Sequence, residues 1–258
     1  MTRNLWLRCA LIIGVGLLIP TASQAASNLV VIATQLDADW ESGTWDSGLT
    51  PAPVPSFQNE GDTNVTTVAA TNHYVEASTN FARSGSYSLK VFGQSAQPKN
   101  ARRSEIGFMK DAYRYNPGES YYYAVSYCPD SSYSVSNKFD TVITQWKPFG
   151  SGPNQSIKIM NDGTHRIFLK SNSVQTNYPL GELPLNEWTD LVFYFKWSLN
   201  PDGVTKIWKN GTLILDITGP TLVKDGQGYM QMGMYTCINE PRTIYIDNVR
   251  IGTSLRQD

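Results

Sequence analysis

Three short stretches, far apart in the chain, each place polar side chains on one face of a predicted strand. In an extended strand successive side chains point to opposite faces, so residues two apart lie together. The pairs that share a polar face are Arg103 with Glu105, Gln145 with Lys147, and Gln231 with Tyr235. Cations and amides can hold a carboxylate, and a phenol can transfer a proton. A sheet that brought these strands together would therefore gather groups suited to an anionic ligand.

The third stretch, Tyr229–Cys237, alternates between two kinds of chemistry. Met230, Met232 and Met234 share one face, which we expect to be core, and Tyr229 shares the polar face with Gln231 and Tyr235. Gly233 stands in the middle of the polar face. A glycine weakens a strand, so its presence indicates that something approaches the backbone closely there.

The elements that must position these residues are short strands. From Asn28 onward no long helical period and no internal repeat occurs, and alternating runs separated by turn residues favour a β-sandwich. The segment 82–91 is expected to be a turn that leads into a strand. The further predicted strands are 102–108, 120–128, 141–147, 156–160, 166–170, 188–197, 204–209, 212–216, 229–237 and 243–251. Two hairpin turns are expected, at Asn161-Asp162-Gly163 and at Asn210-Gly211.

The first hairpin carries a small basic face. Lys158, Arg166 and Lys170 lie opposite the aliphatic side chains of the same two strands by parity. They are candidates for binding an anionic ligand. The alternative is ordinary solvated charge on the outside of a sheet.

The first 25 residues have the features of a secretory leader. Arg3 and Arg8 precede an apolar run over 10–19, and a small-x-small site predicts cleavage after Ala25. The apolar run is too short for a membrane span, which needs about 20 residues. We therefore expect a single domain over 26–258, monomeric, secreted or periplasmic, and free of the membrane once the leader is removed.

Charge and cysteine content limit the function and leave the disulfide question open. The leader contains two basic residues, so the formal charge of −1 becomes −3 without it. Such a protein lacks the broad basic face that nucleic-acid binding requires. Cys128 and Cys237 remain after cleavage, and an oxidising compartment permits them to pair without requiring it.

The three stretches also resemble motifs of known enzymes. Tyr229–Cys237, which reads YMQMGMYTC, is similar to the YFKAG-x-YNQ motif of jelly-roll alginate lyases and keeps both tyrosines and the glycine. RSEIG, at 103–107, resembles the RSELR strand of that group. Gln145-Trp146-Lys147 resembles its Gln-Ile-His triplet and the Gln-Trp-His triplet of heparin lyase I relatives. The three motifs cover about twenty residues and occur in the family's order.

The resemblance implies a jelly-roll sandwich of two antiparallel sheets with a concave substrate face, and a polysaccharide lyase of the heparin lyase I, glucuronan lyase and alginate lyase group. It assigns the catalytic tyrosine to Tyr235 and carboxylate neutralisation to Arg103 and Gln145. The chain departs from the pattern at Lys147, which excludes a histidine base at that position. It departs again at Gly107, where alginate lyases have an arginine, and at Gln231, which replaces their motif lysine.

The implied reaction is cleavage of an anionic polyuronate by β-elimination. Arg103 and Gln145 would stabilise the charge that develops on the uronate when its C5 proton is removed. Tyr235 would take that proton, give one to the leaving oxygen, or do both. A free phenol has a pKa of about 10, and nearby cations such as Arg103 and Lys147 favour its ionised form. The low number of basic residues favours an unsulfated polymer such as glucuronan or alginate.

The roles of several other polar residues stay open. Lys147 can neutralise charge, contact a neighbouring sugar or be an ordinary surface lysine, and Glu105 is expected to orient Arg103. His73 is a candidate replacement base or an ordinary loop histidine. No cofactor is needed for the chemistry.

A structural calcium ion is the one metal that the sequence suggests. Asp37, Asp39 and Glu41 alternate near the start, and Asp247 lies in the last strand. Jelly rolls of this type often join their first and last strands through such oxygens, which suit a hard cation. Glu41 and Asp247 are the predicted ligands.

Two other functions remain possible from the sequence. A retaining glycoside hydrolase needs two carboxylates about 5 to 5.5 Å apart, and the chain lacks the strand motif that supplies them most simply. A carbohydrate-binding module or lectin needs no base. It would use Trp146, Trp197, Trp208 and the tyrosines as stacking platforms.

Overall fold

The computed structural model describes residues 29–44, 57–58, 64–65, 73–93, 102–109, 111–135, 140–236 and 240–257. The predicted leader and Cys237 lie outside these ranges, as do the side chains of Arg103 and His73. Within the described ranges, no helix has the length and apolar character needed to cross a membrane.

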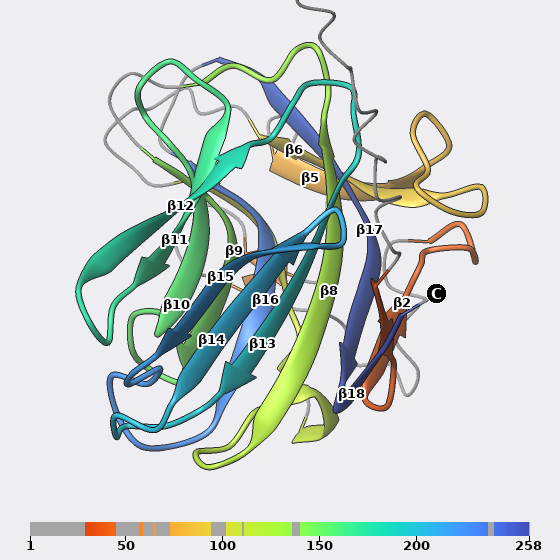
Figure 1. Cartoon of the computed structure of the whole chain (residues 1–258). Coiled ribbons are helices and arrows are strands. Elements are labelled where there is room, and N and C mark those ends of the chain that lie inside the picture. Colours follow the sequence, from red (N-terminus) through yellow and green to blue (C-terminus); the bar gives the residue numbers. More distant parts are fainter. Residues whose placement is uncertain are drawn as a thin grey trace, which may run out of the picture.

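The fold is a sandwich of two large antiparallel sheets, shown in Figure 1. The first, which we call the β9 sheet, has this spatial order: β12 (Thr176–Glu182), β11 (Arg166–Ser171), β10 (Gln155–Ile159), β9 (Thr141–Pro148), β16 (Gly228–Thr236), β7 (Arg102–Gly107), β3 (Phe57–Gln58) and β4 (Asn64–Val65). The expected jelly-roll class is confirmed, and the predicted strands from 102 onward match the observed ones to within two residues at each end.

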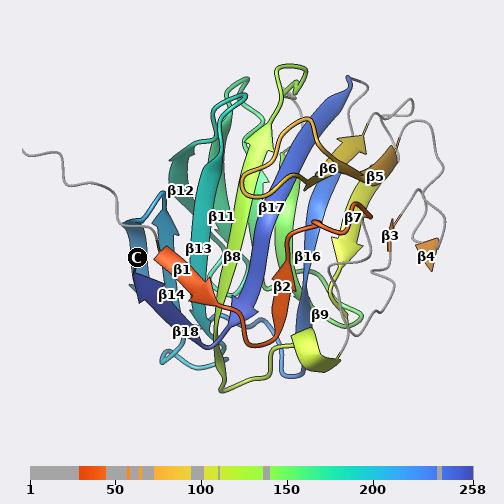
Figure 2. The same ribbon diagram turned by 90° about the vertical axis from the view of Figure 1, so that its right-hand side faces the viewer.

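The second sheet, which we call the β8 sheet, packs against the first. Its order is β15 (Thr212–Thr218), β14 (Val204–Lys209), β13 (Thr189–Lys196), β8 (Ser120–Pro129), β17 (Arg242–Gly252), β6 (Ser88–Gly93) and β5 (His73–Ser78), with β2 (Leu36–Ala38) paired to β17. Outside both sheets, β1 (Leu29–Ile32) pairs with β18 (Ser254–Gln257), and a single turn of 3-10 helix, η1, spans Asp111–Tyr113. Figure 2 looks onto the outer face of the β8 sheet, over which the β1–β18 ribbon lies.

The space between the sheets is filled by apolar and aromatic side chains. Met230, Met232 and Met234 are fully buried there, as the alternation in their strand predicts. Trp146 lies at the centre, with its ring centroid 4.8 Å from that of Phe195. Because Trp146 and Trp197 are both 0% exposed, the expectation that these two rings serve as sugar-stacking platforms is wrong.

Both predicted hairpins are confirmed. Asn161-Asp162-Gly163 connects β10 to β11, and Asn210-Gly211 connects β14 to β15. Asn210 and Gly211 have φ angles of +48° and +80°, as the tight turn between two antiparallel strands requires. The first hairpin sets the register of two of the strands beside the candidate site.

Candidate functional site

The three strands with polar faces are neighbours in the β9 sheet, in the order β9, β16, β7. On one row Gln231 is directly opposite Gln145 on one side and Gly107 on the other. On another row Tyr235 is directly opposite Arg103. On β16 the core face carries the buried Met230, Met232 and Met234. The polar faces of these three strands are on the other side, which is the outer face of the β9 sheet.

A buried carboxylate stands at the centre of the set. Gln145 Nε2 donates a hydrogen bond of 2.7 Å to Glu105 Oε1, and Gln231 Nε2 donates one of 3.2 Å to Oε2. The exposed fractions of Glu105, Gln145 and Gln231 are 0%, 4% and 1%. A carboxylate can be kept out of water only if hydrogen bonds compensate it, and the two amides supply them. We call these three residues the polar floor of the candidate site.

Gly233 lies directly opposite Glu105 and allows β7 to approach β16 closely. Its φ is +134°, and a Cβ at this position would lie 2.1 Å from the carbonyl oxygen of Ser104. The close approach inferred from the mid-strand glycine is therefore that of the neighbouring strand. The pairing of β16 with β9 also shifts register between Met232 and Tyr235. Such bulges redirect the side chains that follow them.

Tyr235 follows this shift and is partly exposed, in contrast to the floor residues. Its row crosses four strands, from Arg103 through Tyr235 and Val142 to Lys158. Lys158 is half-buried, with its Nζ 4.0 Å from Asp140 Oδ2. In this row Tyr235 therefore has a basic residue on each side. Arg103 is directly opposite it, and Lys158 is two strands away in the other direction.

A second row begins with Lys147, which is directly opposite Tyr229. Lys147 is partly exposed, whereas Tyr229 is only 5% exposed and packs against Phe149 with ring centroids 4.9 Å apart. The Tyr229 ring therefore contributes mainly to packing. The guanidinium of Arg114 stacks on the other ring of this pair, 4.6 Å from the Phe149 centroid.

Arg114 is a cation beside the site that the sequence did not reveal. It follows η1 and forms an ion pair of 2.5 Å with Asp111. The backbone of the next residue, Tyr115, bridges to Gly228 at the start of β16, which places this segment next to the site strands. Arg114 lies in a loop, and the alternation of side chains along a strand gives no information about the position of loop residues.

The predicted basic face of the first hairpin is only partly directed at the site. Ser156 is directly opposite Gln145, and Lys170 is directly opposite Ser156, so the row of the polar floor continues to a half-buried lysine. Arg166 is exposed and bonds to Asp162 within its own hairpin. Of the three basic residues, Lys158 and Lys170 share rows with the site strands, and Arg166 holds the turn.

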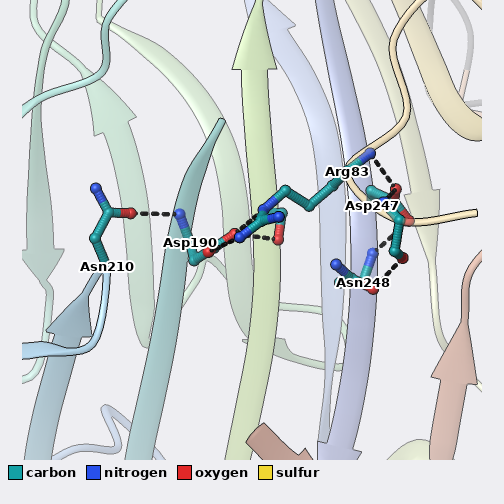
Figure 3. Close-up of polar contacts among 7 residues, drawn as sticks. Arg83, Asp190, Asn210, Asp247 and Asn248 are labelled. Atoms are coloured by element: carbon teal, nitrogen blue, oxygen red, sulfur yellow. Dashed lines mark hydrogen bonds and ion pairs between the residues drawn. The ribbon is translucent and has the colours of Figure 1, made fainter. Parts of the chain in front are cut away.

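His73 and Asp247 belong to the β8 sheet, and Glu41 lies in the turn after β2. His73 begins β5, the edge strand of the β8 sheet, although β5 also contacts β7. Asp247 Oδ2 accepts hydrogen bonds from the backbone N–H groups of Arg83 and Ser84, at 2.8 and 3.2 Å (Figure 3). Glu41 Oε1 accepts from those of Ser86 and Tyr87, both at 2.9 Å. Both carboxylates hold the same loop.

Burial raises the pKa of Asp247 to about 6, and the charge of Glu41 adds to the increase, although backbone N–H donors oppose it. A nearby cation would offset the effect of Glu41 on Asp247, and carboxylate oxygens are ligands that suit a hard cation. In the described part of the chain, no three His, Cys, Asp or Glu residues cluster as a metal site.

Cys128 is buried and carries a free thiol, whose pKa burial raises to about 11. A thiol with a raised pKa is mostly protonated at neutral pH and hence unreactive. Cys237, with which the sequence permits a disulfide without requiring it, is outside the described ranges.

The chain is similar to known lyases in sequence family and in fold. The family model described as polysaccharide lyase matches residues 53–250. No protein with curated annotation is similar enough to this chain to count as a relative.

Several solved structures share the fold. An endo-β-1,4-glucuronan lyase from the fungus Trichoderma reesei is 20% identical, with a TM-score of 0.58 over 78% of this chain and 96% of its own. The cellulose-induced protein Cip1 is 17% identical, with a TM-score of 0.57 over 85% and 97%. The alginate lyase AlgAT5, of polysaccharide lyase family 7, is 13% identical, with a TM-score of 0.50 over 73% and 85%. At these identities the likeness establishes the fold.

Proposed function

The chain belongs to the polysaccharide lyase family, and on that premise we propose that it cleaves an unsulfated polyuronate, such as glucuronan or alginate, by β-elimination on the outer face of the β9 sheet. The observation that carries the proposal is the position of Tyr235. This partly exposed phenol is directly opposite Arg103 and next to a floor of buried amides and one carboxylate.

The reaction begins with a uronate whose C5 proton is acidified by neutralising the neighbouring carboxylate. Arg103 supplies the positive charge, because a guanidinium can form two parallel hydrogen bonds to a carboxylate. Gln145 supports it: one of its two amide N–H groups donates to Glu105, and the other can donate to the substrate. These donors stabilise the enolate-like charge as it develops, which is usually the largest catalytic contribution.

Tyr235 then transfers the proton. As a phenolate it removes the C5 proton, and as a phenol it protonates the O4 leaving group, so one residue can serve both steps. Arg103 is directly opposite Tyr235 on the neighbouring strand, and Lys158 lies further along the same row. Both basic residues would attract the anionic uronate to the phenol.

We use Lys170 and Lys147 to propose the direction in which the polymer crosses the sheet. The row from Gln231 through Gln145 and Ser156 to Lys170 crosses four neighbouring strands. With strands about 4.8 Å apart, it spans roughly 14 Å, enough for more than one sugar. We place successive uronates along this row, with Lys170 at one end and Lys147 one row away.

We also propose a structural Ca²⁺ held by Glu41 and Asp247. The two carboxylates supply the oxygen ligands that a hard cation prefers, and both hold the loop at 83–87. Burial raises the pKa of Asp247 and the charge of Glu41 adds to the increase, so a cation there would favour the ionised carboxylate. The ion would fasten the loop that both carboxylates already bind, and it takes no part in catalysis.

We propose that residues 1–25 are a secretory leader and that the enzyme works outside the cytoplasm, as a monomer. Amino-terminal sequencing of the exported protein should begin at Ala26. Size-exclusion chromatography with light scattering should give the mass of one chain. A mature protein that retains residues 1–25, or a dimer mass, would contradict this part of the proposal.

The test of the main proposal is an activity screen. Purified protein is incubated with glucuronan, alginate and heparin, and both the ultraviolet absorbance of unsaturated uronate and the formation of reducing ends are followed. New absorbance with the first two polymers is expected. Reducing ends without absorbance would mean hydrolysis, and binding without either would favour the carbohydrate-binding alternative.

A further inference from the structure

A cavity of about 400 Å³ lies on the outer face of the β8 sheet, on the opposite side of the sandwich from Tyr235. It is bounded by β1 on one side and by β8, β13 and the Asn210-Gly211 turn on the other. Figure 2 shows this side of the molecule, with the β1–β18 ribbon over the sheet. The cavity volume is within the range of about 300 to 1,000 Å³ that is usual for small-molecule sites. The chemistry proposed for the β9 sheet does not use it.

One wall of the cavity is a fixed polar cluster, drawn in Figure 3. Arg83 reaches from the loop before β6 and binds Asp190 through Nε at 3.0 Å and Nη2 at 2.9 Å. Ser126 Oγ donates to the same carboxylate at 2.7 Å, and Asn210 Oδ1 accepts the backbone N–H of Asp190 at 2.9 Å. Hydrogen-bonding groups held in this way can receive a ligand without first being ordered.

The floor and the other wall are apolar. On β13 the alternation places Asp190, Val192 and Tyr194 on the outer face, and Trp188 lies just before this strand. Trp188 and Val192 line the cavity together with Ala124 of β8. A flat indole beside fixed hydrogen-bonding groups is suited to a sugar, which has apolar C–H faces and a polar rim.

The same face continues as a row of aromatic rings. Tyr194 is directly opposite Tyr122, with ring centroids 4.8 Å apart, and the centroid of Trp208 is 6.3 Å from that of Tyr122. All three rings are partly exposed. Val192, in the cavity, is directly opposite Trp208, so the aromatic row begins where the cavity ends.

The charges of the lining balance within pairs. Arg83 pairs with Asp190, and Arg250 pairs with Asp37 at 3.1 Å. A lining with matched charges favours an uncharged ligand over a polyanion, which would need unpaired cations.

We propose that this cavity, with the adjoining aromatic row, is a non-catalytic binding site for an uncharged oligosaccharide. The cavity holds one or two sugar residues against Trp188, and the chain continues over Tyr194, Tyr122 and Trp208. The site would attach the protein to neutral glycan while the opposite sheet acts on the polyuronate. It does not depend on the reaction proposed for that sheet.

The experiment measures binding of cellotetraose, xylotetraose and mannotetraose by calorimetry and by change in tryptophan fluorescence. Wild type should bind at least one of them saturably. Trp188→Ala should weaken the binding about tenfold, and Trp188→Phe, which keeps an aromatic ring, by about threefold or less. The Phe variant also guards against loss of folding in the Ala variant. Turnover of polyuronate should stay within about twofold of wild type in both variants, because Trp188 is on the other face.

Tyr235→Phe separates this proposal from the lyase proposal. It should abolish polyuronate turnover and leave tetrasaccharide binding unchanged. If wild type binds none of the three tetrasaccharides, or if Trp188→Ala binds as tightly as wild type, the proposed site does not exist. If binding persists but no polyuronate is cleaved, the site stands and the lyase proposal fails.

Discussion

Each sheet has, on its outer face, a carboxylate bound by side-chain hydrogen-bond donors, and these two carboxylates differ in burial. On the β9 sheet Glu105 is 0% exposed and bound by two amides. On the β8 sheet the side chain of Asp190 is 35% exposed and that of its partner Arg83 is 38% exposed. Removing one member of a buried polar network leaves hydrogen-bond donors without a protein partner and out of reach of water, which is costly. When one member of an exposed ion pair is removed, water binds the other, so the cost in stability is small. The β9 face should therefore tolerate change least, in both stability and chemistry.

The largest effect should come from removing the phenolic hydroxyl of Tyr235. We expect Tyr235→Phe to lower kcat by about 10²- to 10⁴-fold, as is usual for loss of an acid–base group. The change removes one oxygen from a partly exposed ring and keeps the packing of the ring, so Tm should move by less than about 4 °C, the effect of about one hydrogen bond. Initial rates on the best polyuronate and a thermal melt measure both. Retention of more than a few per cent of wild-type turnover would eliminate Tyr235 as base or acid.

The next effect should come from the polar floor. Glu105→Ala leaves the amides of Gln145 and Gln231 without their buried acceptor, and we expect a loss of about 2–4 kcal/mol. For a domain of this size that lowers Tm by about 5–15 °C. Turnover should fall as well, because the amides lose their fixed orientation. The measurement is denaturant unfolding together with initial rates.

Glu105→Gln is the matched control for the floor. It keeps the shape and one acceptor, so it should lose clearly less stability than Glu105→Ala. If the alanine variant is as stable as wild type, the floor is not a stabilising network and the contrast between the two faces fails.

A smaller effect concerns Asp247, a buried carboxylate of the β8 sheet. Its pKa is raised to about 6, above the value of about 3.9 expected in the unfolded chain. Its contribution to stability is therefore fully present below about pH 4 and is lost as the pH rises through about 6. In the presence of a chelator, the Tm of wild type relative to Asp247→Asn should fall over that interval.

Calcium should reverse the fall in the Tm of wild type relative to Asp247→Asn. At pH 7.5, added Ca²⁺ should raise the Tm of wild type, and Asp247→Asn should respond little or not at all. Thermal melts with EDTA and with Ca²⁺ give the comparison. An equal response in both proteins would remove Asp247 from the metal site, and a Tm difference independent of pH would contradict the raised pKa.

The smallest effect should come from the exposed ion pair. Arg83→Ala keeps the backbone N–H that binds Asp247 and removes only the guanidinium, so we expect a loss of about 1 kcal/mol or less. A double-mutant cycle with Asp190→Ala, repeated at high salt, isolates the pair. A loss as large as that of Glu105→Ala would show that burial does not distinguish the two faces.

The alternation of side chains predicted much of this architecture. It assigned Met230, Met232 and Met234 to the core and Gln231 and Tyr235 to the opposite face. The two sets differ in chemistry because one face of this strand packs between the sheets and the other does not. The two hairpin turns followed from their asparagine and glycine residues, which adopt positive φ readily. These features are local, so the sequence displays them directly.

Contacts between strands could not be predicted in the same way. We expected Glu105 to orient Arg103, and the contacts of its carboxylate with Gln145 and Gln231 were missed because parity does not give the register of distant strands. β12 was also missed. It contains Pro179 and Gly181, which are poor strand formers and are tolerated because β12 is an edge strand. The cavity beside Trp188 depends on β1, whose place over the β8 sheet no local pattern reveals.

The order of strands has a consequence for how the chain folds. β16 lies between β9 and β7, and β17 lies between β8 and β6, yet each follows both of its neighbours in the chain. Until these two late strands are inserted, all four neighbours keep open edges, which readily pair with other molecules. Contacts of such long sequence separation also form slowly. Aggregation during refolding should therefore compete with the insertion of β16 and β17, and a chain that stops before Gly228 should aggregate instead of folding.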